Sequence, residues 1–213
     1  MSLLGVYGAA GFGREVMGML GPSVLQGRKA VFIDDADGPA VVNGRECMKF
    51  DDFVARACAG SSVTIAIADS AIRQKLANKC AALDMRCETV QAANTVVMEN
   101  VEMGDGAILC PFATITSNIT IGRHFHANIY SYVAHDCVIG DFVTFAPAVK
   151  CNGNVHIEDH TYIGSGAIIR QGAPGKPLVI GRGAVVGMGA VVTKDVPAGA
   201  TVVGNPARML ERR

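Results

Sequence analysis

The feature that most constrains this 213-residue chain is a six-residue period between residues 97 and 174. Every sixth residue from Val97 to Ile169 is apolar or small, and so is a second series, four places later, from Val101 to Ala173. An α-helix cannot keep residues six apart on one face, and an ordinary strand alternates every second residue. A hexapeptide period is typical of a parallel β-helix, in which three six-residue sides form one coil and both series point inward. We therefore predict a parallel β-helix over residues 91–213.

The period breaks once, at a segment that the pattern predicts to be a loop. After Ile169 the next matching residue is Ile180, eleven places on instead of twelve. The intervening residues 170–177 hold two prolines and two glycines, which favour a loop that leaves the coil. A tolerated surface insertion and a loop over a ligand at the edge of the prism both remain open. Residues 194–199 and 203–208 are expected to cap the prism.

Residues 1–90 follow a different pattern, in which expected strands alternate with expected helices. This alternation predicts a small parallel sheet with helices on its faces, so that residues 1–90 form a Rossmann-like α/β domain. The expected strands are 3–7, 30–33, 62–68 and 85–90, and the expected helices are 14–20, 48–58 and 70–83.

A glycine-rich turn, residues 8–13 (GAAGFG), lies between the first expected strand and the first expected helix. Such a turn lets the backbone approach a phosphate at a helix N-terminus. An acidic residue at the end of the second strand, here Asp34 or Asp35, suits a ribose hydroxyl. Glycine turns also form for packing reasons alone, so nucleotide binding and a structural role both stay open. Arg73 is expected either to reach a diphosphate or to be an ordinary exposed helix arginine.

Charge and cysteine usage narrow the function classes. The 19 basic and 19 acidic residues give a net charge of zero, which argues against a nucleic-acid-binding surface. No apolar stretch reaches the roughly 18 residues of a membrane span, and the N-terminus does not resemble a signal peptide. The seven cysteines include no CxxC, and Cys137 and Cys151 fall on inward positions. This usage indicates buried thiols in a reducing cytoplasm rather than a disulfide framework.

The five histidines all fall outside the two inward series, at positions 124, 126, 135, 156 and 160. His135 stands apart because Asp136 follows it, and a carboxylate in contact with an imidazole orients it and makes it a stronger base. Strand neighbours point to opposite faces, so this contact requires a corner of the coil. A zinc site of the γ-class carbonic anhydrase type is a further interpretation. Its histidine spacing differs from that seen here, however, and it gives the first domain no role, so we expect no metal.

Two segments carry a resemblance to a known family: Tyr132–Gly153 (YVAHDCVIGDFVTFAPAVKCNG) and the C-terminal VVGNPAR. With GAAGFG and FIDD, they make nearly the whole chain resemble the NeuD/PglD-type bacterial acetyltransferases. That family acetylates hydroxyls of sialic acid or the amines of nucleotide-linked 4-amino sugars. The resemblance implies a left-handed β-helix that forms a cytoplasmic homotrimer and uses acetyl-CoA in surface polysaccharide biosynthesis. Its N-terminal domain would hold the acceptor.

The resemblance also implies residue roles. His135 would be the general base and Asp136 would raise its basicity. Acetyl-CoA would lie between adjacent prisms, with a backbone N–H, for which Gly153 is the candidate, polarising the thioester; the cofactor-binding residues would be Thr144, Gly153, Ser165 and Met188. The acceptor nucleotide would contact Ala10, Gly11, Phe12, Asp34, Asp35, Ala68 and Arg73. Many relatives have His at the position of Phe12 and Glu at the position of Asp136.

The leading hypothesis is therefore an acetyl-CoA-dependent N-acetyltransferase that acts on a nucleotide-linked 4-amino-4,6-dideoxy sugar. The alternatives are an O-acetyltransferase for sialic acid or a related sugar, the same fold with a longer acyl-CoA, a non-catalytic trimer, and the metal enzyme. The sequence does not distinguish UDP, GDP and dTDP as the nucleotide.

Overall fold

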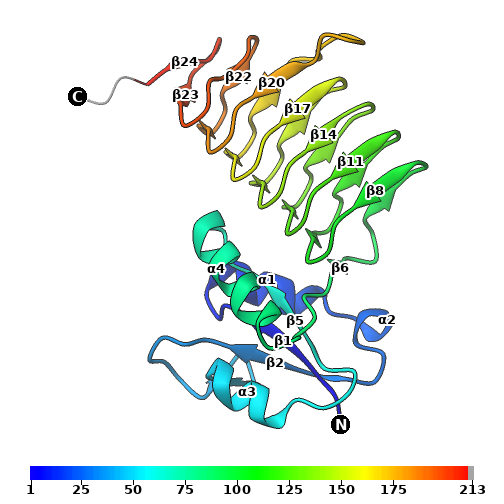
Figure 1. Ribbon diagram of the computed structural model, residues 1–213, viewed down its shortest axis with the longest axis vertical. Helices are drawn as coiled ribbons and strands as arrows, with labels where there is room; N and C mark the ends of the chain where they lie inside the picture. Colours follow the sequence, from blue (N-terminus) through cyan, green and yellow to red (C-terminus); the bar gives the residue numbers. More distant parts are fainter. Residues whose placement is uncertain (211–213) are drawn as a thin grey trace. The chain divides into compact units, whose positions relative to one another are not determined.

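The computed structural model describes residues 1–210, which divide into two compact units. The first unit spans Met1–Ala93 and the second begins at Asn94, whereas the sequence pattern places the boundary after residue 90. Figure 1 draws both units with the chain coloured from blue to red.

The first unit is a Rossmann-like α/β fold on a five-stranded sheet with the order β3-β4-β2-β1-β5. β1 pairs in parallel with β2 and β5, β2 pairs in parallel with β4, and β3 is antiparallel to β4. The strand β1, between β2 and β5, is buried along its whole length, as its continuous apolar run LLGVY requires. The elements are β1 (Leu3–Tyr7), α1 (Gly11–Met19), α2 (Pro22–Leu25), β2 (Lys29–Ile33), β3 (Val41–Val42), β4 (Arg45–Met48), α3 (Phe50–Arg56), β5 (Ser62–Ile65), α4 (Ser70–Ala81) and β6 (Val90–Gln91).

The largest difference from the sequence prediction is the β3–β4 hairpin, because we predicted no element between the second strand and the helix expected over residues 48–58. Asn43 and Gly44 form its turn with φ angles of +49° and +73°. An Asn-Gly pair is a favoured two-residue hairpin turn, because both residues tolerate positive φ. The third expected strand also ends early, since β5 stops at Ile65.

The second unit is a left-handed parallel β-helix, as the six-residue period and the family resemblance together predict. Ile115 pairs with Val133, and Val133 with Cys151, so each regular coil is eighteen residues long. One sheet contains β7 (Val96–Val97), β10 (Thr114–Ile115), β13 (Tyr132–Val133), β16 (Lys150–Cys151), β19 (Ile168–Ile169) and β22 (Val191–Val192). The second contains β8 (Val101–Met103), β11 (Ile119–Ile121), β14 (Val138–Ile139), β17 (Val155–Ile157) and β20 (Leu178–Ile180). The third contains β9 (Ile108–Leu109), β12 (His126–Ala127), β15 (Thr144–Phe145), β18 (Tyr162–Ile163), β21 (Val185–Val186), β23 (Thr201–Val203) and the antiparallel β24 (Arg208–Met209).

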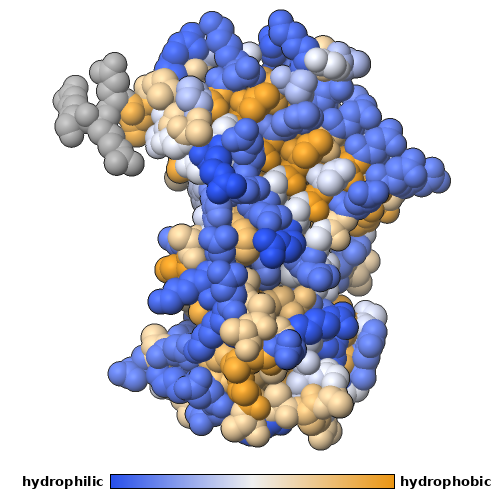
Figure 2. Space-filling model, in the orientation of Figure 1, coloured by the Kyte–Doolittle hydropathy of each residue, from blue (hydrophilic) through white to orange (hydrophobic). Residues whose placement is uncertain are grey.

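Both inward series form the core of the β-helix. From Ala107 to Ile169 every member is at most 3% exposed. The first and last positions of the predicted pattern, Val97 and Ala173, are exposed, because Val97 lies in the edge strand of its sheet and Ala173 lies outside the strands, between β19 and β20. Apolar side chains also lie outside the coils, and Figure 2 shows hydrophobic patches (orange) among the polar side chains of this unit.

The break in the period is a loop that projects from one coil. Ile139 pairs with Ile157, but Ile157 pairs with Ile180, so the extra residues fall between β19 and β20. Ala173 and Lys176 close this loop by exchanging two backbone hydrogen bonds of 3.0 and 2.9 Å.

The strands of each coil meet at three corners, which we name by one residue of each. The His135 corner joins the β13 sheet to the β14 sheet, the Phe142 corner joins β14 to β15, and the Ser165 corner joins β18 to β19. At every corner one residue per coil adopts a left-handed conformation; the examples are Asp136, Phe142 and Tyr130 with φ angles of +59°, +59° and +58°.

Among residues 1–210 no helix is both long and apolar enough to cross a membrane.

Candidate functional site

The side chains of His135 and Asp136 form an exposed pair on the β-helix. The Nδ1 atom of His135 lies 2.7 Å from the Oδ2 atom of Asp136, and both side chains are 47% exposed. The left-handed backbone of Asp136 turns its carboxylate toward the ring of the preceding residue, which an extended strand would not allow. A carboxylate at Nδ1 favours the tautomer with the proton on Nδ1 and leaves the Nε2 lone pair available to accept a proton.

Gly153 lies directly against this imidazole, one coil further on. A Cβ atom at residue 153 would stand 2.5 Å from Cε1 and 2.6 Å from Nε2 of His135. The Asn154 N–H also donates to the carbonyl of His135 at 3.0 Å. The missing side chain of Gly153 therefore gives the ring its space, a role that the sequence prediction of a backbone donor did not include.

The other predicted cofactor residues lie elsewhere on the β-helix. Ser165 and Met188 occupy successive coils at the Ser165 corner, where the Gly189 N–H donates to the carbonyl of Ser165 at 2.8 Å. Met188 is 82% exposed, which is unusual for an apolar side chain of this size. Thr144, in β15, is only 3% exposed. Within one chain, Ser165 and Met188 are thus at a different corner from His135.

The remaining histidines are less uniform than the sequence predicts. His124 and His126 are buried although both fall outside the inward series. His124 stacks on Phe142, and Phe142 stacks on His160, with ring centroids 5.0 and 5.3 Å apart. This stack follows the Phe142 corner from coil to coil, so His124 and His160 pack there as flat rings. Among the described residues no group of three or more His, Cys, Asp or Glu side chains is arranged to hold a metal ion.

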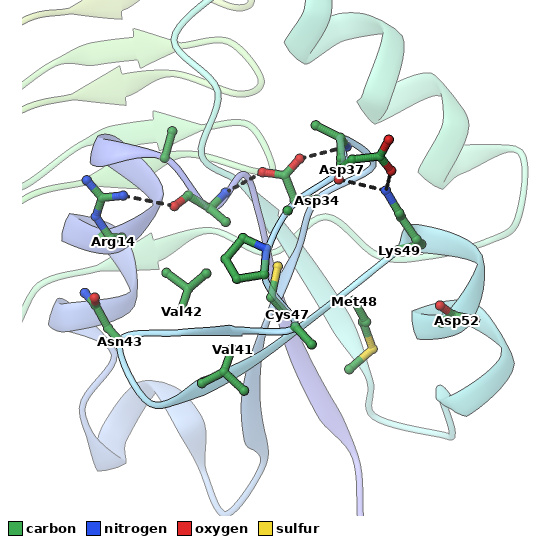
Figure 3. A pocket seen from close by; sticks show the side chains of 16 residues that line it. Arg14, Asp34, Asp37, Val41, Val42, Asn43, Cys47, Met48, Lys49 and Asp52 are labelled. Atoms are coloured by element: carbon green, nitrogen blue, oxygen red, sulfur yellow. Dashed lines mark hydrogen bonds and ion pairs between the residues drawn. The ribbon is translucent and has the colours of Figure 1, made fainter.

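The first unit contains a pocket of about 710 Å³ beside the glycine-rich turn (Figure 3). The predicted residues Ala10 and Asp34 line it, and of the other predicted acceptor residues none belongs to its wall among the described residues. Four charged residues that we did not predict line it: Arg14, Asp37, Lys49 and Asp52. The Lys49 ammonium donates to Asp37 at 3.3 Å and to the carbonyl of Ala36 at 2.7 Å, which fixes the loop before β3.

The three glycines of the turn differ in what they allow. Gly8 has a φ of +110°, which few other residues adopt. A Cβ at Gly13 would lie 1.8 Å from the carbonyl oxygen of Gly8, so Gly13 permits close packing of α1 on the turn. Gly11 has open space around it and begins α1, whose N-terminus has no side-chain cap. The positive end of the helix dipole at this N-terminus and the nearby Arg14 suit an anionic group.

The two aspartates after β2 have different surroundings. Asp34 accepts the Ala9 N–H at 3.1 Å and the Ala36 N–H at 3.0 Å, and so holds the glycine turn against the pocket loop (Figure 3). Asp35 accepts hydrogen bonds from the Tyr7 hydroxyl, the Phe50 N–H and the Lys79 ammonium. Burial alone would raise the pKa of the Asp35 carboxyl, but these donors outweigh burial and hold its pKa below the ordinary value. Asp35 therefore joins structural elements of the first unit, and Asp34 is the aspartate at the pocket.

Arg73 is not the exposed helix arginine that one of our two sequence interpretations described. Its side chain is 0% exposed, and Nη1 donates to the carbonyls of Ile67 and Ala68 at 2.7 and 3.1 Å. These bonds fix the segment between β5 and α4, which includes the predicted residue Ala68. Phe12 is half-buried in the first turn of α1.

Comparison with known proteins places these features in a family. Residues 4–80 match the PglD N-terminal domain. A GDP-perosamine N-acetyltransferase of Escherichia coli O157:H7 is 49% identical over 100% of this chain and 98% of its own length.

Two solved structures are similar over almost the whole chain. WeeI from Acinetobacter baumannii AYE is 55% identical, with a TM-score of 0.95, over 99% of this chain and 100% of its own. The acetyltransferase domain of PglB from Neisseria gonorrhoeae FA1090, in complex with acetyl coenzyme A, is 28% identical, with a TM-score of 0.87, over 98% of both chains. The chain therefore belongs to the NeuD/PglD-type family of bacterial sugar acetyltransferases and is an acyltransferase.

Proposed function

We propose that this chain transfers the acetyl group of acetyl-CoA to the amine of a nucleotide-linked 4-amino-4,6-dideoxy sugar, and that His135 is the general base. The observation that carries the proposal is the exposed pair of His135 and Asp136, with 2.7 Å between Nδ1 and Oδ2. The name of the relative that is 49% identical makes GDP-perosamine the first acceptor to test. We infer GDP as the nucleotide on the same ground.

The proposed reaction is a direct transfer. The acceptor nitrogen attacks the thioester carbonyl carbon, a C–N bond forms, the C–S bond breaks and CoA leaves as a thiolate. The Nε2 atom of His135 takes a proton from the attacking amine and returns one to the thiolate, so no covalent enzyme intermediate is needed. Asp136 holds the ring and stabilises the imidazolium that forms, as the carboxylate does in other His–Asp pairs.

The separation of the corners supports a homotrimer with the site between chains. Ser165 and Met188, proposed to contact acetyl-CoA, lie at a different corner of the coil from His135. A groove between two prisms brings the Ser165 corner of one chain beside the His135 corner of another. Exposed apolar side chains on the outside of the coils, Phe112, Tyr130 and Met188 among them, are the kind of surface that association covers.

The pocket of the first unit is the proposed site of the nucleotide. The N-terminus of α1 and Arg14 would contact the diphosphate, with Ala10 and Gly11 close to it. Asp34 would hold the glycine turn in place, and Phe12, Ala68 and Arg73 would act through the shape of the surrounding segments. A cytoplasmic location fits the seven free cysteines and the supply of acetyl-CoA and nucleotide sugars.

Release of CoA with a panel of acceptors tests this proposal. We expect turnover with GDP-perosamine, and little with UDP- or dTDP-linked 4-amino sugars or with sialic acid. His135→Ala should lower kcat by about 10²–10⁴-fold, the usual contribution of a general base. His156→Ala is the matched control, because His156 is an exposed histidine on β17.

Three results would contradict parts of the proposal. Turnover only with sialic acid would make the enzyme an O-acetyltransferase. Equal rates for His135→Ala and His156→Ala would remove His135 as the base. A monomer mass in light scattering would remove the shared site.

A further inference from the structure

A column of amide and carboxylate side chains leads along the His135 corner to the catalytic pair. Its members are eighteen residues apart and occupy the same place in successive coils: Asn100, Asn118, Asp136 and Asn154, with φ angles of +54°, +56°, +59° and +55°. Asn and Asp tolerate this left-handed conformation better than most residues, which is one reason to find them here.

The backbone conformation alone does not explain the column. The non-glycine residues at the equivalent left-handed positions are His124, Phe142 and His160 at the Phe142 corner, and Phe112, Tyr130 and Ala148 at the Ser165 corner. The other two corners thus accept aromatic residues and alanine, as well as glycine, at this turn. The His135 corner differs in having polar side chains that can bond to one another.

Two hydrogen bonds join the column to the pair. The Asn100 amide Nδ2 donates to Oδ1 of Asn118 at 3.2 Å, and Nδ2 of Asn118 donates to Oδ1 of Asp136 at 3.4 Å. The remaining oxygen of Asp136, Oδ2, faces Nδ1 of His135. A primary amide has one acceptor oxygen and one donor nitrogen, so the bond from Asn100 fixes which end of Asn118 faces the carboxylate.

We propose that Asn118 is a positioning residue for the reaction, which acts through Asp136 on His135. A carboxylate with one donor on each oxygen is held in a single orientation, and here that orientation presents Oδ2 to the imidazole. Asn118 therefore keeps the proton on Nδ1 and the lone pair on Nε2. Asn100 supports Asn118 from one coil further away. The inference rests on the proposed function, because it takes His135 as the base.

Two substitutions separate this role from a merely structural one. Asn118→Gly removes the donor and keeps the tolerance of positive φ. Asn118→Asp keeps both the size and the tolerance but replaces the donor by a second carboxylate. We expect kcat to fall about fivefold for Asn118→Gly and at least about tenfold for Asn118→Asp, with KM for both substrates within about twofold, as for residues that orient a catalytic group. Asn100→Gly should lower kcat less than Asn118→Gly.

A measurement on the imidazole gives a second, independent readout. Histidine labelled with ¹³C reports the titration of His135 by NMR in the absence of substrates. The added negative charge in Asn118→Asp should move this titration to higher pH, because it favours the imidazolium. Asn100→Gly leaves the charge unchanged and should titrate as the wild type does.

The outcomes distinguish the failure of each idea. If Asn118→Asp keeps the wild-type kcat and the wild-type His135 titration, Asn118 serves only the backbone and the inference is wrong. If the wild type acetylates none of the acceptors but Asn118→Asp still shifts the titration, the proposed function fails while the hydrogen-bonded column stands.

Discussion

The two units of this chain place their functional residues by different physical rules. In the β-helix, a residue's number fixes its coil, its side and its direction, because each regular coil repeats after eighteen residues. In the α/β unit, the position of a side chain depends on loops whose course the sequence does not repeat. The coil repeat therefore places the side chains of the proposed catalytic pair, whereas loops place the side chains that line the pocket of the first unit.

The largest expected effect tests the rule for the β-helix. Phe145 is an inward residue, is 0% exposed, and packs edge-on against Phe125 with centroids 5.1 Å apart. Phe145→Ala should reduce the free energy of unfolding of the second unit by about 3–5 kcal/mol, because it removes a buried ring and leaves a cavity. Chemical denaturation followed by hydrogen exchange of peptides from residues 107–169 measures this loss.

The matched control is Val138→Ala, on the outside of the neighbouring strand β14, where the side chain is 43% exposed. Its cost should stay within about 0.5 kcal/mol, as for ordinary surface positions. Similar losses of unfolding free energy for Phe145→Ala and Val138→Ala would show that the six-residue register does not distinguish inward from outward side chains.

The sequence predicted much more of the second unit than of the first, for this same reason. The period identified the inward residues from Ala107 to Ile169, and the corner position of His135 and Asp136 allowed their contact. The period alone did not show that Gly153 lies against His135. That contact follows only when the coil length of eighteen residues is added to the number of His135. Counting eighteen back from Asp136 would also have identified Asn118.

In the first unit the alternation of strands and helices predicted the fold, but individual residues were harder to place. Asp35 and Arg73 have the residue types of a nucleotide site, yet hydrogen bonds direct Asp35 to Tyr7 and Arg73 to backbone carbonyls. No local pattern shows which of two adjacent aspartates will face a pocket. The β3–β4 hairpin had a usable signal in Asn43-Gly44, and recognising it would have placed the pocket loop and Lys49.

The next effect concerns the space that the β-helix leaves beside the proposed base. Gly153→Ala would place a Cβ 2.5 Å from the His135 ring, so the ring must turn away from its position. We expect kcat to fall about 10–100-fold, equivalent to the 1–3 kcal/mol that overpacking usually costs. Steady-state kinetics with both substrates measures it.

Gly140→Ala provides equal crowding at the Phe142 corner, since its Cβ would lie 2.4 Å from Oδ1 of Asp159. It should lower thermal stability but leave kcat within about twofold, because it does not contact His135. A larger loss of kcat for Gly140→Ala than for Gly153→Ala would mean that coil stability, rather than ring position, limits turnover.

A smaller effect tests whether electrostatics holds the first unit together. Glu88 accepts two hydrogen bonds from Arg28, at 2.5 and 2.9 Å, and one from the Ser62 hydroxyl, and its side chain is only 13% exposed. The Arg28 guanidinium holds the pKa of Glu88 below its ordinary value, although burial opposes this. A lowered pKa in the folded state gives stability that is present above the unfolded pKa of about 4.3 and is lost as the pH falls through the folded value.

Glu88→Gln should therefore destabilise the first unit by about 1.5–3 kcal/mol at pH 7 and by much less near pH 3, because it weakens hydrogen bonds to a charged group. Hydrogen exchange of peptides from residues 1–90 at both pH values measures this. Glu46→Gln is the control, because its pairs with Lys29 and Arg56 are more exposed and should contribute much less to stability. A Glu88→Gln effect that does not change with pH would assign the loss to packing.

The smallest expected effect lies at the pocket, where loops rather than register set the geometry. The two carboxylate oxygens of Asp34 accept the N–H groups of Ala9 and Ala36. Asn at this position keeps one acceptor but presents an NH₂ group to the other donor, so the glycine turn should lose one of its two ties to the pocket loop. Under the proposed function, Asp34→Asn should raise KM for the nucleotide sugar about fivefold, near 1 kcal/mol, with kcat unchanged.

The control is Asp51→Asn, which removes the same charge from a side chain that is 93% exposed and should change neither KM nor kcat. Equal KM values for the two variants would mean that net charge, and not the two backbone hydrogen bonds to Asp34, determines KM for the nucleotide sugar. Asp34 would then no longer support the contrast between a β-helix placed by its repeat and a pocket placed by its loops.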